Sequence, residues 1–284
     1  MRIVTIFARH GSEKYPDAEQ KVNEIFARQL PRIERRAIVI DNSLPSEFVE
    51  GSSPSRVLIG GENSSWEFSA WNKGLDFLGD EVWSYDLVHL ATSAFYSLYV
   101  KYLEHFDQTM LEAINRRPVC LGHIDTYNER VRISSFHSQH WIRTSFLFAP
   151  PTELKILRTL ASLSNPFHLF GSGPHEPFVP EGFISRNYQS YVLDWLTGTD
   201  IGQGSIWHSK IALTDESWPL FKEKATAIFN EHLLSIRLRA QGTRLIDTTW
   251  LSSQLKTHSP SRVDWNKPSL DQLAEREFDK VILR

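Results

Sequence analysis

Hydrophobic and polar residues follow two different patterns in the first thirty residues of the chain. Residues 2–8 (RIVTIFA) are continuously apolar and rich in β-branched side chains, which is typical of a strand buried on both faces. Residues 17–30 then place apolar side chains three and four positions apart on a single stripe, with Asp17 as the expected N-cap. This opening predicts a buried strand followed by an amphipathic helix.

The same pattern continues over the first hundred residues. Segments 36–45, 57–63 and 85–95 are short, apolar and followed by turn-forming or polar residues, as strands are. The segment SSWEFSAWNKGLDFLG predicts a helix that Ser64 or Ser65 caps and Gly79 ends. Strands that alternate with helices predict an α/β fold with a mostly parallel, Rossmann-like sheet.

Beyond Pro118 the pattern changes. PVCLGHI, RVRISSF and WIRTSFLFAP predict strands that extend or cross the sheet, separated by the polar stretch DTYNE. Helical patterns follow at 152–163, 186–197 and 215–239, and a loop rich in Pro and Gly at 164–182 is expected to hold no regular structure. We expect three parts: a core at 1–150, a helical and loop region at 151–255 that completes an acceptor side, and a polar tail at 256–284.

Composition narrows the class of protein. The 284 residues are 41% hydrophobic and 23% charged, as in ordinary globular proteins, and the net charge of -3 offers no field for nucleic acid. The single cysteine, Cys120, sits in an apolar run and indicates a reducing compartment. No signal peptide and no apolar window of about 20 residues is present, so we expect a cytoplasmic protein with at most peripheral membrane contact. The oligomeric state is left open.

Polar side chains follow the predicted parallel strands where those strands end. In open α/β sheets, ligands bind outside the carboxyl ends of the strands. We therefore expect one pocket at the tips that carry Arg9, Asp41–Ser43, Glu62–Asn63 and Thr92–Ser93.

The order of several motifs resembles a known family. VIDNS, then GEN, WEFSAWNKGL and a YDLVHLATS strand are similar to the nucleotide-binding half of inverting glycosyltransferases of the family 2 type, which have a GT-A fold. The bacterial branch of rhamnan-synthesis and other surface-polysaccharide transferases is the most similar, and HWIRTSFLFAP resembles its later strand. The resemblance covers residues 2–150.

This resemblance implies that a nucleotide diphosphate sugar donates its sugar, with inversion, to a saccharide or glycoconjugate acceptor. Asp41 would accept hydrogen bonds from the base, with the alternative that Asp41 and Asn42 only close an Asx-turn. The helix start near Trp66 would approach the sugar and the diphosphate. The implied donor-binding residues are Arg9, Asp41, Asn42, Ser43, Glu62, Asn63, Trp66, Ser69, Lys73, Thr92, Ser93 and Arg143.

The sequence departs from the family where a metal would bind. Most GT-A enzymes carry a DxD motif at the fourth strand, whose carboxylates hold a divalent metal, but the strand tip here is ATSAF. Two alternatives stay open. Either Mg²⁺ or Mn²⁺ binds through Asp125 or Glu62, or no metal is used and basic side chains stabilise the leaving group. The basic candidates are Arg9, Lys73, Arg143 and Arg186.

Inverting transfer needs a general base for the acceptor hydroxyl. The first choices are His137 and His140, because they precede the strand that resembles the family's later motif and because histidine titrates near neutral pH. Asp125 is the third catalytic candidate, and Glu176, Glu181 and Asp194 remain open. A zinc site at His137 and His140 is rejected, since side chains three apart on a strand point to different faces.

Two other functions compete with glycosyl transfer. A transferase-like protein that lost its carboxylate pair would bind nucleotide sugars, or act as a scaffold, without turnover. A Ser-His hydrolase is less favoured because the sequence has no G-x-S-x-G elbow. The loop around Gly202 and Gly204 is expected to cover the acceptor site.

Overall fold

The computed structural model describes residues 1–97, 100–163, 166–180, 182–198 and 210–276. The expected loop around Gly202 and Gly204, and the base candidate Glu181, lie outside these residues. The chain divides into two compact units. The first comprises Met1–Ile124, Ile142–Leu160 and Arg237–Arg284, and the second Asp125–Trp141 and Ala161–Ile236.

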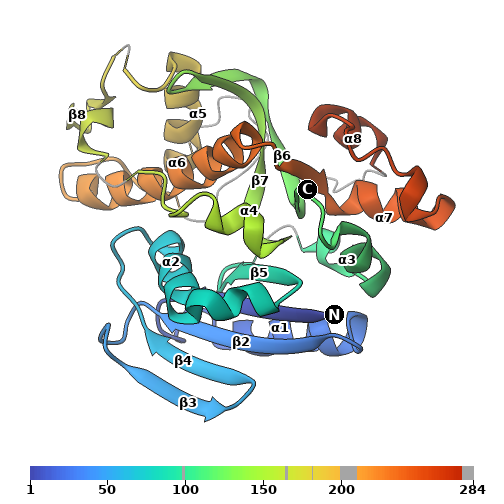
Figure 1. The fold of residues 1–284 in the computed structure, drawn as a ribbon. Helices are drawn as coiled ribbons and strands as arrows, with labels where there is room; N and C mark the ends of the chain where they lie inside the picture. Colours follow the sequence, from blue (N-terminus) through green and yellow to red (C-terminus); the bar gives the residue numbers. More distant parts are fainter. Residues whose placement is uncertain (98–99, 164–165, 181, 199–209, 277–284) are drawn as a thin grey trace. The chain divides into compact units, whose positions relative to one another are not determined.

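An eight-stranded mixed sheet organises the fold, in the order β10-β6-β7-β5-β1-β2-β4-β3. Its central strands β1, β2, β4 and β5 are parallel, whereas β3 is antiparallel to β4, and β7 to β5. The expected α/β fold with a mostly parallel sheet is thus confirmed (Figure 1). The strand bounds are β1 Arg2–Arg9, β2 Glu34–Asp41, β3 Val49–Ser53, β4 Arg56–Gly60, β5 Leu87–Thr92, β6 Val119–Ile133, β7 Phe136–Ala149 and β10 Arg244–Asp247.

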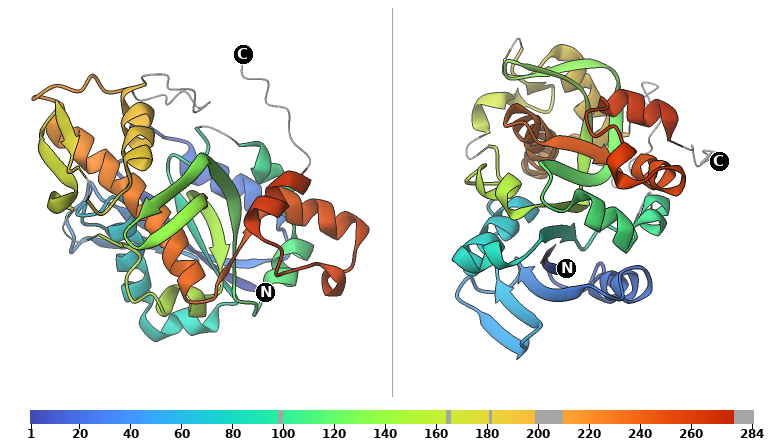
Figure 2. Two further views of the ribbon diagram at one scale, coloured as in Figure 1. Left: turned by 90° about the horizontal axis from the view of Figure 1, so that it is seen from above. Right: turned by 45° about the vertical axis from the view of Figure 1, so that its right-hand side comes forward.

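Helices cover both faces of the parallel strands because each face is apolar. Helix α1 (Ala18–Gln29) buries its apolar stripe in one core together with Ile3 and Phe7 of β1. Helix α2 (Glu67–Leu78) covers the opposite face so closely that a Cβ on its Gly74 would lie 2.3 Å from the Ile6 side chain. Figure 2 shows the two helices on opposite sides of the sheet. Side chains alternate along β1, which explains how one strand serves both helices.

The C-terminal part of the first unit is built on strand β10, which pairs in parallel with β6. Asp247, at the end of β10, is fully buried and caps helix α7 (Thr248–Thr257) by accepting from the Trp250 amide at 3.0 Å. The expected polar tail contains a further helix, α8 (Ser269–Glu275), which buries Leu273 and Gln272. The remaining elements of this unit are η1 Gly79–Ser84, η2 Lys101–His105, α3 Gln108–Ile114, α4 Pro151–Lys155 and η4 Pro260–Arg262.

The second unit has a core of its own, dominated by aromatic rings around Tyr127, Trp141 and Tyr188. Helices α5 (Arg186–Thr197) and α6 (Trp218–Ala240), the latter continuing into the first unit, agree closely with the helical patterns at 186–197 and 215–239. The Pro- and Gly-rich stretch is not wholly irregular: η3 (Phe167–Leu169) precedes a two-stranded sheet of β8 (Phe170–Gly173) and β9 (Glu176–Phe178).

Two further local predictions were wrong and one strand was missed, each for an identifiable reason. DTYNE does not interrupt a strand but lies inside β6, because Tyr127 is buried among aromatic rings while its polar neighbours are more exposed. The helix expected at 152–163 ends after Lys155 in α4, and Arg158 adopts a left-handed φ of 62°. Strand β3 was missed because its VEGSS sequence carries almost no hydrophobic pattern. Within the described residues, no helix is long and apolar enough to span a membrane.

Candidate functional site

The carboxyl ends of β1, β2, β4 and β5 lie side by side in the first unit. Arg9 at the end of β1 is paired with Asp41 of β2, and Asp41 with Gly60 of β4. On the other side of β1, Ala8 is paired with Thr92 of β5. The register therefore brings the four expected tips to one sheet edge, although Arg9 and Ser93 are more than eighty positions apart in the sequence.

Asp41 is the centre of this edge and is almost completely buried, with 3% of its surface exposed. Its Oδ1 accepts from the Gly11 amide at 2.8 Å, the Ser43 amide at 3.0 Å and the Ser43 hydroxyl at 2.6 Å. Its Oδ2 accepts from Nε of Arg9 at 2.7 Å. Burial raises the pKa of Asp41, but the hydrogen bonds from Ser43, Gly11 and Arg9 outweigh it and hold the pKa below its usual value.

These contacts give Asp41 a structural task. The bond from the Ser43 amide forms an Asx-turn, which is the alternative that the sequence left open, and the bond from Gly11 fixes the loop after β1. Gly11 has a φ of 65°, a conformation that favours glycine. Both carboxylate oxygens are engaged within the protein, so recognition of a base by Asp41 stays a prediction that these contacts do not favour.

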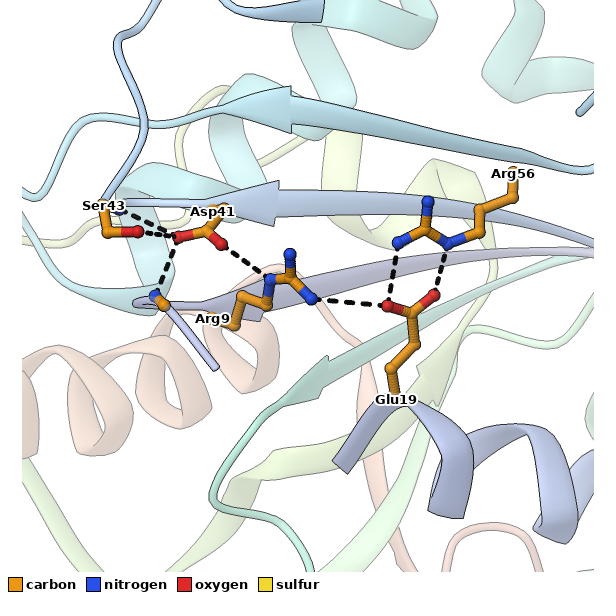
Figure 3. A network of polar contacts seen from close by, with 6 residues as sticks. Arg9, Glu19, Asp41, Ser43 and Arg56 are labelled. Atoms are coloured by element: carbon orange, nitrogen blue, oxygen red, sulfur yellow. Dashed lines mark hydrogen bonds and ion pairs between the residues drawn. The ribbon is translucent and has the colours of Figure 1, made fainter. Parts of the chain in front are cut away.

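Arg9 is turned back along the sheet rather than out from its edge (Figure 3). Its guanidinium joins Asp41 to Glu19 of α1, with Nη1 of Arg9 3.5 Å from Oε2 of Glu19. Arg56, near the start of β4, holds the same Glu19 through two bonds of 2.5 and 3.0 Å. Burial raises the pKa of Glu19, yet Arg56 and Arg9 together keep it below its usual value. Two positive and two negative charges thus balance in one chain of contacts.

The loop between β4 and α2 is shaped by side chains that the sequence assigned to ligand binding. Nδ2 of Asn42 donates to the Trp66 carbonyl at 3.0 Å and to Oδ1 of Asn63 at 3.2 Å. The Ser69 hydroxyl donates to the carbonyls of Glu62 and Trp66, at 2.6 and 2.8 Å. Asn42 and Ser69 therefore connect the β2 tip to this loop, so the Asp41 turn and the Trp66 helix are neighbours.

Trp66 itself has a strained backbone and an unengaged side chain. Its φ of 54° and ψ of -130° are rare for a residue with a Cβ and cost about 1–3 kcal/mol. Within the described part of the chain, its indole, which is partly exposed, makes no hydrogen bond, cation-π contact or ring contact. Strain of this kind persists only where the surroundings hold it, and here the two donors to the Trp66 carbonyl do so.

The other tip residues differ in how much they offer to a ligand. The hydroxyls of Thr92 and Ser93 are partly exposed and form no hydrogen bond with any residue that the structure describes. Ser43 and Glu62 are exposed, Ser43 being tied to Asp41. Lys73 donates to the Ser46 carbonyl and so fastens the loop after β2. Arg143 lies partly buried on β7 in the first unit.

The start of α2 is a poor phosphate site. The Phe68 amide donates to the Ser65 carbonyl at 3.1 Å, and the acidic Glu67 occupies the first turn. An anion there would find the Phe68 amide already hydrogen-bonded and would be repelled by Glu67. This repulsion offsets the attraction of the helix dipole for an anion. The expectation that these amides face a diphosphate is therefore not favoured.

The donor atoms at the β5 tip do not suit a divalent metal. Mg²⁺ prefers carboxylate oxygens, but Thr92 and Ser93 are neutral, and Asp41 has both oxygens engaged. Among the described residues, no group of three or more His, Cys, Asp or Glu side chains is arranged to hold a metal. No step of a mechanism is therefore assigned to Mg²⁺ or Mn²⁺.

The expected acid-base residues belong to the second unit, whereas the donor-side residues belong to the first. Asp125 lies partly buried on β6. Burial lowers the pKa of His232 to about 3, although the charge of Asp125 acts to raise it. His137 is exposed at the start of β7, and His140 is partly buried three positions later. Both histidines lie within β7, whereas the sequence predicted that they precede this strand. Their role in proton transfer stays a prediction.

Two surface hollows lie in the first unit, neither of them lined by the strand-tip residues. The first, of about 440 Å³, is lined by α3 residues with Arg116, Arg117 and Pro260. The second, of about 240 Å³, lies between α2 and the segment 154–160. Asn72 of α2 binds this segment through Thr159 Oγ1 at 2.8 Å and the Leu160 amide at 2.7 Å, so Asn72 is structural.

Sequence reasoning missed Glu19, which pairs with Arg9, and Arg56, which holds Glu19. Both resemble ordinary surface charges in the sequence, because Glu19 lies in the first turn of a helix and Arg56 at the start of a strand. Only their meeting in space reveals the network. No protein-family model matches this sequence, and no curated protein matches it either.

Proposed function

We propose that this protein is a glycosyltransferase of the GT-A type, which transfers a sugar from a nucleotide diphosphate sugar to the hydroxyl of a saccharide or glycoconjugate, with inversion. The sugar-phosphate bond breaks, a glycosidic bond forms, and the nucleotide diphosphate leaves with its negative charge as the acceptor loses a proton. Synthesis of a bacterial surface polysaccharide is the setting that the sequence resemblance favours.

One observation carries this proposal. The strand order reverses at β1, which has β2 on one side and β5 on the other, with α1 and α2 on opposite faces. Nucleotides bind outside the carboxyl ends of parallel strands at such a switch point. The β5 tip at this point carries the hydroxyls of Thr92 and Ser93, which form no hydrogen bond with a described residue. The partly exposed Trp66 lies beside the neighbouring β2 tip, where its carbonyl accepts from Asn42.

The contacts divide the donor-side residues into two groups. Trp66, Thr92 and Ser93 are proposed to touch the donor. Asp41, Arg9, Asn42 and Ser69 are proposed as positioning residues, because their polar atoms are already bonded to the backbone or to each other. The acceptor proton is proposed to go to His137, His140 or Asp125, each of which is testable by replacement with alanine.

A thermal-shift screen of nucleotide diphosphate sugars tests donor binding, since a ligand that binds only the folded state raises the melting temperature. We expect at least one nucleotide diphosphate sugar to raise it and Ser93→Ala to weaken that shift. The donor that binds is then mixed with saccharide acceptors, and release of the nucleotide diphosphate is followed. If no nucleotide or nucleotide sugar binds at millimolar concentration, the proposal is wrong.

A second candidate function has specific support. The neutral β5 tip and the engaged oxygens of Asp41 are what a nucleotide-sugar-binding protein without turnover would show. The same two assays separate the candidates, because a scaffold would give the thermal shift without release of nucleotide diphosphate on adding acceptors.

A further inference from the structure

Trp66 differs from the buried tryptophans of the first unit. Trp71 donates its indole N–H to the Ala91 carbonyl and packs edge-on against Phe68, and Trp250 donates to Glu275. Such bonds are what a tryptophan needs when it is buried for packing alone. The Trp66 indole has no equivalent partner among the described residues, although it stands at the sheet edge where a ligand is proposed to bind.

The surroundings hold Trp66 in a conformation that its own backbone disfavours. Asn42 from the β2 tip and Ser69 from α2 both donate to its carbonyl, and a Cβ on Gly61 would lie 2.0 Å from Oδ1 of Asn42. Gly61 is therefore required for Asn42 to reach the loop. Residues from three separate segments of the chain thus fix the backbone that carries the Trp66 ring.

The hydrogen-bond donors next to this ring are occupied, and Oδ1 of Asn42 is buried next to Gly61 without a partner among the described residues. The donors of Asn42 and Ser69 are bonded to the protein, and both oxygens of Asp41 already accept hydrogen bonds. A pyranose is recognised through several directed hydrogen bonds to its hydroxyls, which these groups do not offer. A nucleobase needs only a flat face, because every base can stack on an aromatic ring.

We infer that Trp66 is the stacking surface for the nucleobase of the donor, and that this site therefore discriminates little between bases. The inference rests on the proposed function and replaces the expected reading of the base by Asp41. It predicts that UDP, dTDP, GDP and ADP bind with dissociation constants within about tenfold of each other, since stacking tolerates any base.

Isothermal titration of these four diphosphates, and of inorganic pyrophosphate, tests the inference with three variants. Trp66→Gly removes the ring at a position whose positive φ suits glycine, so the variant is expected to fold. It should weaken all four nucleotides about tenfold or more and leave pyrophosphate unchanged. Trp66→Phe should retain most of the affinity. The matched control is Trp83→Ala, which removes an exposed tryptophan in η1, after helix α2. This variant should bind the four nucleotides as the wild type does.

The outcomes separate this inference from the proposed function. If the wild-type protein binds none of the nucleotides, the proposed function fails. If it binds them and Trp66→Gly, folded by circular dichroism, binds equally well, only the stacking inference is overturned. A preference of more than about a hundredfold for one base also overturns it, because directed hydrogen bonds would then read the base.

Discussion

The sheet edge around Asp41 and the aromatic core around His232 hold buried ionisable side chains in opposite charge states. Both bury ionisable side chains. At the edge, Asp41 and Glu19 are kept charged by arginines and backbone amides, so that their pKa values fall. In the second unit, His232 is kept neutral among Trp141, Tyr127 and Tyr188, and burial lowers its pKa to about 3.

The difference indicates what each region is built for. Charge-assisted hydrogen bonds are directional, so the Asp41 carboxylate sets the positions of the loops after β1 and β2, at the edge where a ligand is proposed to bind. Aromatic rings pack without charge, and burial among them raises the pKa of Tyr127 and Tyr188. The four predictions below test this contrast.

Removing the carboxylate at the centre of the edge should have the largest effect. Asp41→Ala leaves the amides of Gly11 and Ser43 and the Arg9 guanidinium without their acceptor. We expect the free energy of unfolding to fall by about 3 kcal/mol, measured by urea denaturation. The control Glu62→Ala, an exposed carboxylate, should change it by less than about 0.5 kcal/mol. Equal effects from both substitutions would mean that the network is not what holds the edge.

As the pH falls, protonation of the unfolded chain at His232 should lower the free energy of unfolding before protonation of Asp41 and Glu19 does. The unfolded chain protonates His232 as the pH falls below 6.5, whereas the folded protein resists until about pH 3. The unfolded state then binds more protons, so the free energy of unfolding falls by about 2 kcal/mol between pH 7 and pH 5 on account of this residue. The carboxylates of Asp41 and Glu19 contribute only at lower pH, since their stabilisation is lost as the pH falls below about 4.

Denaturation at pH 7 and pH 5 of the wild type and His232→Phe measures this contribution. The variant should lose less stability on acidification than the wild type does. His137→Ala, which removes an exposed histidine of the same unit, should follow the wild type. An unchanged pH dependence in His232→Phe would show that His232 is not neutral in the folded protein.

The hydrogen bond inside the aromatic core should appear as a coupling of about 1 kcal/mol. The Tyr188 hydroxyl lies 2.5 Å from Nδ1 of His232, and both groups are buried. Tyr188→Phe or His232→Phe alone leaves a buried polar atom unpaired, whereas the double variant removes both partners. A double-mutant cycle in urea should therefore find the double variant less destabilised than the sum of the single ones. Strict additivity would contradict a direct bond.

The smallest effect on stability should come from Trp66→Gly. Glycine relieves the backbone strain at a φ of 54° but makes the unfolded chain more flexible, so the two contributions oppose each other. We expect the free energy of unfolding to change by less than about 1 kcal/mol, measured by thermal denaturation. Trp71→Gly, inside α2, is the contrast, because this ring is fully buried and its loss should cost about 4 kcal/mol or more.

The periodicity of the sequence was sufficient to predict the framework of this protein. The continuous apolar run at β1, the stripes of α1 and α5 and the turn residues after β2 each follow from local preferences of the chain. Where that local signal is weak, as in the VEGSS strand β3 or the DTYNE stretch of β6, the prediction failed.

The candidate site was predictable as a place but not as a set of contacts. The rule for parallel sheets puts the strand tips together from sequence alone, and the register of Arg9 with Asp41 agrees with it. Which tip residues face a ligand depends on partners far away in the sequence. Glu19 pairs with Arg9 and is itself held by Arg56, and Ser43 and Gly11 donate to Asp41.

The sequence by itself determined the α/β class, the mostly parallel sheet and the edge at which its polar side chains gather, because hydrophobic periodicity is a local property of the chain. The tertiary structure alone decided that Asp41 and Arg9 bind each other while the Trp66 ring stays unengaged. A side chain's availability is set by the hydrogen-bond partners that folding brings within about 3 Å, and these partners come from anywhere along the chain.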